Sequence, residues 1–263
     1  MPKVKVGGQV YKIQAVLLDK DGTILDFVYT WARWGELLLA RFSRELEARQ
    51  LEPLVSGMLA GWGIRKNEQG AVSGYDRNGP LSMGTLEELL TLLAWEGFRR
   101  GLSWAEAKRL AARCRLEADT ALEQEKAVRL LPGVLEFLEN CREAGVPVGL
   151  VTSDETAAAV KHLDWLGISC YFSVCMGADQ VQQSKPFPDM VEEACRRMGI
   201  RPETSVVIGD TNGDMMMGKA AGALAVGLDI SGSPKGMSRG EFQEADWVIR
   251  SYSELEFLKE QVR

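Results

Sequence analysis

The chain has 263 residues, of which 46% are hydrophobic and 26% charged, a composition typical of a globular protein with one large domain or two unequal ones. Its formal net charge of −6 argues against broad binding to nucleic acid or to an anionic membrane, whereas a small anionic substrate held by a few cations is still allowed. With five cysteines, no C-x-x-C pair and one histidine, His162, the sequence excludes a zinc site and a disulfide framework.

The N-terminal sequence MPKVKVGGQVYK lacks the apolar segment of a signal peptide, and no apolar stretch reaches the roughly 18 residues that cross a bilayer. We therefore expect a cytoplasmic protein. Apolar and polar residues alternate on both sides of Gly7-Gly8, which predicts a hairpin. The hairpin leads into the apolar run Ala15–Leu18, which is typical of a fully buried strand.

From Asp26 to Arg129 apolar residues recur at helical spacing, which predicts an almost entirely helical middle third. The helical stretches cover residues 35–49, 84–100 and 103–127, and the last one opens with a capping box formed by Ser103 and Glu106. Residues 63–84 are rich in glycine, asparagine and serine, and we expect a long functional or mobile loop there.

A different pattern begins at Leu131, where helices and short apolar strands alternate to the end of the chain. Strands are predicted at residues 146–153, 171–175, 205–210, 223–228 and 246–250, with helices at 133–145, 155–167, 188–199 and 213–222. Strands alternating with helices at this spacing predict βαβ units and a parallel sheet that is buried on both faces. The helical middle third is then an insertion into an α/β core.

Polar residues follow the carboxyl ends of these strands, which is where open parallel sheets bind their ligands. They are Asp19 and Asp21 after the first buried strand, Thr152 and Ser153 after the second, Asp210 and then Asp214 after a later one, and Lys185 in a connecting loop. Thr152 and Ser153 compete for one hydroxyl role, and Thr152 is favoured because it directly follows the apolar run.

Asp19, Asp21 and Asp210 would bring like charges close together, which destabilises a fold unless something compensates. Mg²⁺ binds one or two carboxylates and keeps positions for waters and a substrate phosphate, so it suits this arrangement. Lys185 would supply a second positive charge for a phosphoryl group, and Thr152 a hydroxyl donor. The sequence therefore predicts a metal and phosphate site.

Four motifs carry a resemblance to a known family: DKDGT, VTS, SKPFPD and GDTNGD occur in this order at the ends of predicted elements. In order and spacing they resemble the four motifs of the haloacid dehalogenase-like superfamily, and the chain looks like a member of its phosphoglycolate-phosphatase-like branch. The resemblance implies a Rossmann-like parallel sheet core of residues 1–25 and 130–263. It also implies that residues 26–129 form an inserted α-helical cap domain.

The resemblance further implies a role for each motif residue. Asp19 would attack phosphorus and form an aspartyl-phosphate, and Asp21 would act as general acid and then as general base. Thr152 and Lys185 would orient and neutralise the phosphoryl oxygens. Mg²⁺ would be held by Asp19, by the backbone carbonyl of Asp21 and by Asp210, while Asp214 either ligates the ion or lies just outside its ligands.

These roles imply a Mg²⁺-dependent phosphatase that hydrolyses a small phosphomonoester, either phosphoglycolate-like or a sugar phosphate. A phosphomutase would use the same aspartyl-phosphate and return the phosphoryl group to a sugar, and it stays an alternative. A protein that binds a phosphorylated metabolite without turnover is the other. The expected partner is a small phosphorylated metabolite, and the expected assembly is a monomer or a homodimer.

Two further expectations concern residues outside these roles. Lys20 stands where many members of the superfamily carry an aromatic residue, and alternation at a strand end predicts that it points away from Asp19 and Asp21 without affecting the chemistry. His162 lies in a predicted helix far from every motif in the sequence, so we expect a structural role for it.

Overall fold

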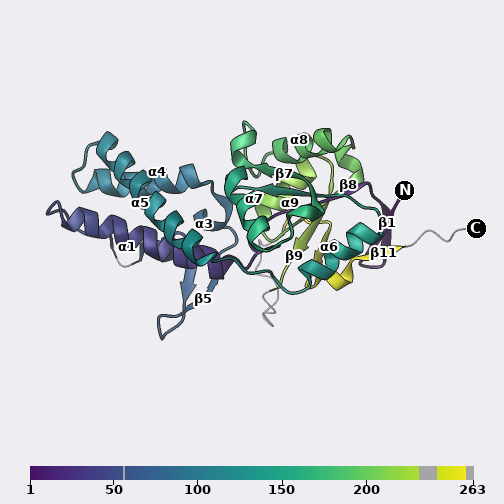
Figure 1. Ribbon diagram of the computed structural model, residues 1–263, viewed down its shortest axis with the longest axis horizontal. Coiled ribbons are helices and arrows are strands. Elements are labelled where there is room, and N and C mark those ends of the chain that lie inside the picture. The colour runs from purple at the N-terminus through teal and green to yellow at the C-terminus, as the bar shows by residue number, and fades with distance from the viewer. Residues whose placement is uncertain (56, 231–241, 259–263) are drawn as a thin grey trace, which may run out of the picture. The chain divides into compact units, whose positions relative to one another are not determined.

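The computed structural model describes residues 1–55, 57–230 and 242–258, and the chain divides into two compact units (Figure 1). Unit 1 contains residues 1–26 and 130–263, and unit 2 contains residues 27–129. No helix among the described residues is long and apolar enough to cross a membrane.

Unit 1 is built on a six-stranded sheet in the order β10-β9-β8-β3-β6-β7. Every neighbouring pair in it is parallel, so the predicted parallel sheet is confirmed. Its strands are β3 (Ala15–Leu18), β6 (Val148–Thr152), β7 (Phe172–Gly177), β8 (Ser205–Gly209), β9 (Leu224–Leu228) and β10 (Trp247–Ile249). All residues of β3, β6 and β8 are buried, as expected for strands covered on both faces.

Four helices of unit 1 follow the predicted βαβ order: α6 (Val134–Glu143), α7 (Thr156–Trp165), α8 (Asp189–Met198) and α9 (Asn212–Ala220). Helices α8 and α9 pack against each other and against the sheet. Their apolar side chains form a buried cluster with those of the central strands, including Leu17, Val151, Met190, Val207 and Met217. Burial of this cluster fixes the strand ends that carry the polar motif residues.

The predicted N-terminal hairpin is confirmed as β1 (Lys3–Val6) and β2 (Gln9–Lys12). Gly7 and Gly8 have φ of 55° and 85°, the left-handed conformations that a tight hairpin turn needs. The sequence did not predict β11 (Glu256–Leu258), which pairs with β1 and completes a three-stranded antiparallel sheet.

Unit 2 is mainly helical, as predicted, and its helices are α1 (Arg33–Glu47), α2 (Met58–Gly61), α3 (Pro80–Met83), α4 (Leu86–Arg99) and α5 (Trp104–Glu125). Helix α5 packs on both α1 and α4. Its predicted capping box is confirmed, because the Ser103 side chain accepts from the Glu106 backbone N–H and the Glu106 carboxylate accepts from that of Ser103.

Residues 63–84 correct the expectation of a long loop. They contain the strands β4 (Ile64–Lys66) and β5 (Val72–Tyr75), which form an antiparallel hairpin, followed by the short helix α3. The side chain of Asn67 accepts hydrogen bonds from the backbone N–H groups of Gln69 and Ala71, and this stabilises the turn between the strands. The middle third is therefore less uniformly helical than its apolar spacing suggested.

Candidate active site

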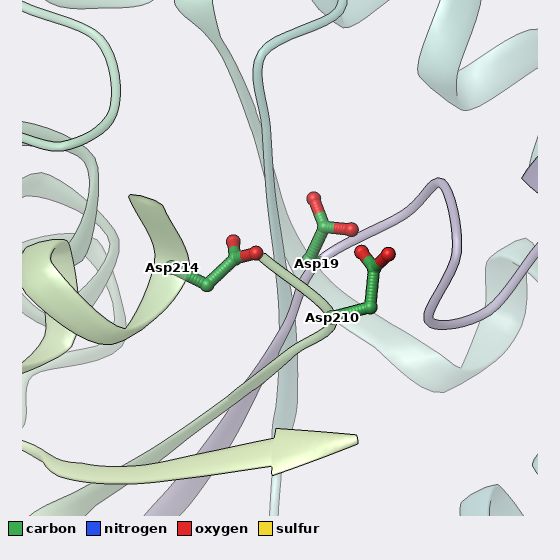
Figure 2. A group of neighbouring side chains, drawn as sticks. All are labelled: Asp19, Asp210 and Asp214. Atoms are coloured by element: carbon green, nitrogen blue, oxygen red, sulfur yellow. The ribbon is translucent and has the colours of Figure 1, made fainter. Parts of the chain in front are cut away.

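Three buried carboxyl groups lie together at the carboxyl ends of β3 and β8. Asp19 directly follows β3, Asp210 directly follows β8, and Asp214 lies in the first turn of α9. Strands β3 and β8 are hydrogen-bonded neighbours, so residues that follow them are brought to the same edge of the sheet. One carboxylate oxygen from each of the three lies within 4.8 Å of the other two, and Figure 2 shows the three groups gathered at this edge.

The ammonium group of Lys185 is in contact with two of these carboxylates. Its Nζ donates to Asp19 Oδ1 and lies 2.6 Å from Asp214 Oδ1. Burial by itself would lower the pKa of Lys185, but the charges of Asp19 and Asp214 outweigh burial and raise this pKa above its ordinary value. Lys185 therefore stays positively charged among the carboxylates.

For Asp19, unlike Lys185, burial outweighs the attraction of the opposite charge. Burial raises the pKa of its carboxyl group well above the ordinary value, and the nearby charges of Asp214 and Asp210 raise it further, although Lys185 lowers it. Lys185 thus forms ion pairs with two of the three neighbouring carboxylates. A hard divalent cation bound by oxygen ligands would relieve this repulsion, so the donor set fits Mg²⁺.

Asp214 also caps helix α9. Its Oδ2 accepts hydrogen bonds from the backbone N–H and the hydroxyl of Thr211, at 3.1 and 2.5 Å. Gly209 allows this close approach, because a Cβ at that position would lie 2.2 Å from Asp214 Cγ. Oδ2 of Asp214 is thus hydrogen-bonded to Thr211, whereas its Oδ1 forms an ion pair with Lys185.

Thr152 ends strand β6 and lies at the same edge of the sheet, because β6 is the other neighbour of β3. The side chain is buried, and its Oγ1 accepts a hydrogen bond from the backbone N–H of Asp154 at 3.2 Å. The hydroxyl proton is not consumed by this bond and can be donated elsewhere. Ser153, the competing hydroxyl, is half-buried.

The carboxyl group of Asp21 has a partner that the sequence did not predict. Its Oδ2 lies 3.1 Å from Nζ of Lys20, so the expectation that Lys20 points away from both aspartates is wrong for Asp21. Alternation fails here because β3 ends at Leu18, and the chain then turns back so that the Lys20 carbonyl accepts from the N–H groups of Ile24 and Leu25.

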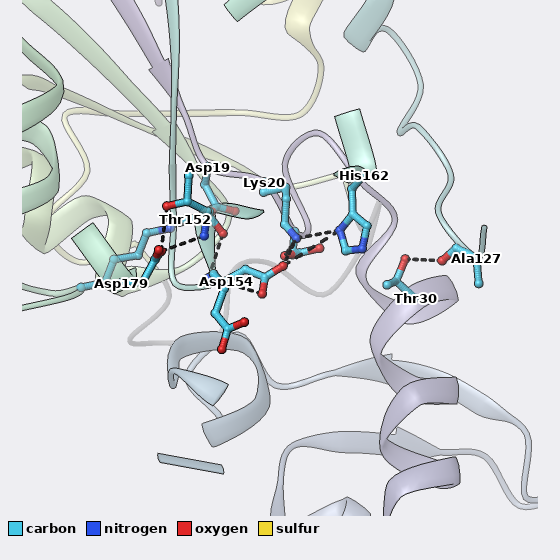
Figure 3. Close-up of polar contacts among 12 residues, drawn as sticks. Asp19, Lys20, Thr30, Ala127, Thr152, Asp154, His162 and Asp179 are labelled. Carbon is cyan, nitrogen blue, oxygen red and sulfur yellow. Dashed lines mark hydrogen bonds and ion pairs between the residues drawn. The ribbon is translucent and has the colours of Figure 1, made fainter. Parts of the chain in front are cut away.

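His162 and Asp154 are also part of this arrangement. Lys20 Nζ lies 2.5 Å from Asp154 Oδ2 and 3.0 Å from His162 Nδ1, and all three side chains are buried (Figure 3). The fold therefore brings His162 next to the first motif, far though it is in sequence. The apolar neighbours Ala159 and Leu163 indicated that His162 is buried and needs a polar partner, but they did not identify Lys20 as that partner.

Comparison with known proteins identifies the family. A family model described as haloacid dehalogenase-like hydrolase matches residues 13–222. Phosphoglycolate phosphatase from Escherichia coli (strain K12) is 36% identical over 134 residues, which are 50% of this chain and 51% of that protein. The corresponding protein from Salmonella choleraesuis is 34% identical over the same length. The chain thus matches about half the length of these relatives.

Solved structures share the fold over nearly the whole chain. A predicted phosphoglycolate phosphatase from Haemophilus somnus superposes with a TM-score of 0.66 at 19% identity, covering 92% of this chain and 96% of that one. A β-phosphoglucomutase from Clostridium difficile gives a TM-score of 0.62 at 18% identity, covering 93% of each chain. The four motifs in this order, the parallel sheet and the match over residues 13–222 together lead to one conclusion: the chain belongs to the haloacid dehalogenase-like hydrolase family.

Proposed function

We propose that the protein is a Mg²⁺-dependent phosphatase that hydrolyses a small phosphomonoester, either phosphoglycolate-like or a sugar phosphate. The observation that supports the proposal most strongly is the buried cluster of Asp19, Asp210 and Asp214, in which Lys185 forms ion pairs with Asp19 and Asp214. The similarity of half of the chain to the phosphoglycolate phosphatase of Escherichia coli supports the same reading.

In the proposed first step a carboxylate oxygen of Asp19 forms a bond to phosphorus. The ester P–O bond breaks, and its electron pair goes to the leaving oxygen, which takes a proton from the carboxyl group of Asp21. In the second step Asp21 removes a proton from water, the water oxygen attacks phosphorus, and the bond to Asp19 breaks. Inorganic phosphate and the free aspartate result.

The charged groups have distinct tasks in this proposal. Lys185 and the hydroxyl of Thr152 would hold the phosphoryl oxygens. Asp19 and Asp210, with the backbone carbonyl of Asp21, would hold Mg²⁺, which when bound supplies positive charge to the phosphoryl group. The contacts of Asp214 with Thr211 and Lys185 favour a role in holding Lys185 rather than the ion.

Residues 26–129 are proposed to act as the cap domain that selects the substrate, because they are inserted between the first and second motifs. A monomer or homodimer in the cytoplasm is proposed as well. All five cysteines are free thiols, which suits a reducing compartment.

The test measures phosphate release from p-nitrophenyl phosphate and a panel of small phosphomonoesters, with Mg²⁺ and with excess EDTA. Asp19→Asn keeps the size of the side chain and removes the nucleophile, so we expect turnover to fall on the order of 10⁴-fold or more. The matched control is Asp164→Asn, an exposed position on α7 that should keep full activity.

Turnover that survives Asp19→Asn would overturn the proposed nucleophile. No phosphate release from any substrate, in protein that still binds Mg²⁺, would overturn the phosphatase. A product in which the phosphoryl group has moved to another position of a sugar would identify a mutase instead, and tight binding without any turnover a binding protein.

A further inference from the structure

Lys20 is a buried ammonium group that the proposed chemistry does not use. Its side chain is fully buried, and its Nζ has three acceptors within hydrogen-bond distance: Asp154 Oδ2 at 2.5 Å, His162 Nδ1 at 3.0 Å and Asp21 Oδ2 at 3.1 Å. An ammonium group carries three N–H donors and no acceptor. The three acceptors can therefore use all three donors, and the side chain is held in one position.

His162 is a neutral acceptor in this arrangement. Because Lys20 can only donate, His162 Nδ1 must accept, and the ring proton is then on Nε2. Burial and the charge of Lys20 lower the pKa of His162 to about 2, so the ring carries no competing charge.

Asp154 is itself fixed from several sides. Its Oδ1 accepts from the backbone N–H of Glu155 at 2.7 Å, and its own N–H donates to Thr152 Oγ1 at 3.2 Å. Its carbonyl oxygen accepts from the N–H of Ala178 at 3.0 Å, which fastens the loop after β6 to the end of β7. Asp154, which binds Lys20, is thus held in place at the edge of the sheet.

We propose that Lys20 is a positioning residue: held by Asp154 and His162, it fixes the orientation of the Asp21 carboxyl group for proton transfer to the leaving oxygen. The proposal rests on the proposed phosphatase function and deepens it. Asp154 and His162 contact neither the phosphoryl group nor the reacting oxygen in this scheme and act through Lys20.

The experiment compares two substrates of nearly the same shape, phenyl phosphate and p-nitrophenyl phosphate. Departure of phenolate benefits from a proton, whereas p-nitrophenolate leaves readily without one. The value of kcat/KM reports the steps up to departure of the leaving group, so it isolates the proton transfer from the later attack of water. A residue that only supports the fold would lower kcat/KM for both substrates by the same factor.

Lys20→Met alone would leave the buried carboxylate of Asp154 without its ammonium, so the main variant is Lys20→Met combined with Asp154→Asn. We expect its kcat/KM for phenyl phosphate to fall about tenfold more than that for p-nitrophenyl phosphate. His162→Leu should shift the same ratio in the same direction, and His162→Asn, which keeps an acceptor for Lys20, should restore it. Circular dichroism and thermal denaturation check that each variant is folded.

Equal falls for both substrates, or no fall in any variant, would overturn the positioning role while leaving the phosphatase intact. Native protein that hydrolyses neither substrate nor any member of the phosphomonoester panel in the presence of Mg²⁺ would overturn the phosphatase itself, and the positioning role with it.

Discussion

Two consecutive residues, Asp19 and Lys20, belong to two buried clusters of opposite character. The Asp19 cluster holds the carboxylates of Asp19, Asp210 and Asp214, and Lys185 forms ion pairs with Asp19 and Asp214. The Lys20 cluster holds one ammonium, the carboxylate of Asp154 and the neutral ring of His162, with Asp21 at its border. The Asp19 cluster has more negative than positive charge. In the Lys20 cluster, the three N–H donors of Lys20 face three acceptors.

We interpret the Asp19 cluster as the proposed binding site and the Lys20 cluster as the structural support beside it. Excess buried charge destabilises a fold, and it is kept where a ligand of opposite charge is to be bound. A cluster whose donors and acceptors satisfy one another stabilises one arrangement of its side chains and does not attract a charged ligand. We therefore expect changes in the Asp19 cluster to alter metal binding and activity first, and changes in the Lys20 cluster to alter orientation and stability first.

Among the variants that test this difference between the two clusters, Asp210→Asn is expected to have the largest effect on turnover. Removing one of three neighbouring carboxylates should lower Mg²⁺-dependent turnover by roughly 10²- to 10³-fold, since a proposed metal ligand is lost. In EDTA the same change should raise the free energy of unfolding by about 1 kcal/mol, because like-charge repulsion is relieved. Phosphate release and urea unfolding, each with Mg²⁺ and with EDTA, measure the two effects.

In this experiment Mg²⁺ should stabilise the native protein and Asp164→Asn but not Asp210→Asn. An Asp210→Asn variant that Mg²⁺ still stabilises as much as the native protein would break the comparison, because the excess charge would then serve no metal.

The next effect concerns Gly209→Ala, whose new Cβ would lie 2.2 Å from Asp214 Cγ. Asp214 would have to move and would release Thr211 and Lys185, so we expect a loss of about 2 kcal/mol in the free energy of unfolding and at least a tenfold loss of activity. Gly149→Ala is the matched control: its Cβ would lie 2.7 Å from Leu17 Cδ2 inside the sheet.

Chemical denaturation and activity per folded molecule distinguish the two glycine variants. Gly149→Ala should destabilise to a similar degree while the folded fraction keeps native kcat. If both variants lost activity per folded molecule equally, the Asp19 cluster would be no more sensitive to distortion than the rest of the sheet.

The smallest effect is expected for His162→Asn, and it depends on pH. The folded-state pKa of His162 is lowered from 6.5 to about 2, so the unfolded chain binds a proton that the folded chain does not. The stability from the neutral ring is therefore fully present above pH 6.5 and is lost as pH falls toward 2. Asparagine does not titrate, so native stability should fall relative to the variant by about 1 kcal/mol for each pH unit below 6.

Urea unfolding at pH 7.5, 6 and 5 measures this difference. Two stability curves that stay parallel across these values would mean that folding does not lower the pKa of His162, and the neutral acceptor role of its ring next to Lys20 would then be wrong.

Sequence reasoning reached the parallel sheet and the grouping of Asp19, Lys185, Asp210 and Asp214, because these depend on local features. Apolar runs identify buried strands, and polar residues at strand ends converge wherever parallel strands are neighbours. The capping box of α5 was predicted for the same reason, since Ser103 and Glu106 form it within one turn.

The Lys20 cluster was missed because its geometry depends on tertiary structure. The direction of the Lys20 side chain is set by the turn after β3, where Gly22 has φ of 87° and strand alternation no longer applies. The β4–β5 hairpin was missed because its strands are short and only partly buried, so period-two alternation hardly shows.

The position of β3 in the sheet has a consequence for how the chain is synthesised. β3 lies in the middle of the sheet, yet both of its neighbours, β6 and β8, emerge from the ribosome only after the whole of residues 27–129. Contacts within residues 27–129 join positions that are closer in sequence, so we expect these residues to fold first. During that time Ala15–Leu18 cannot pair with β6 or β8. The four apolar residues of this fully buried strand are thus exposed on the nascent chain until β6 and β8 have been synthesised, and a chaperone would have reason to bind them.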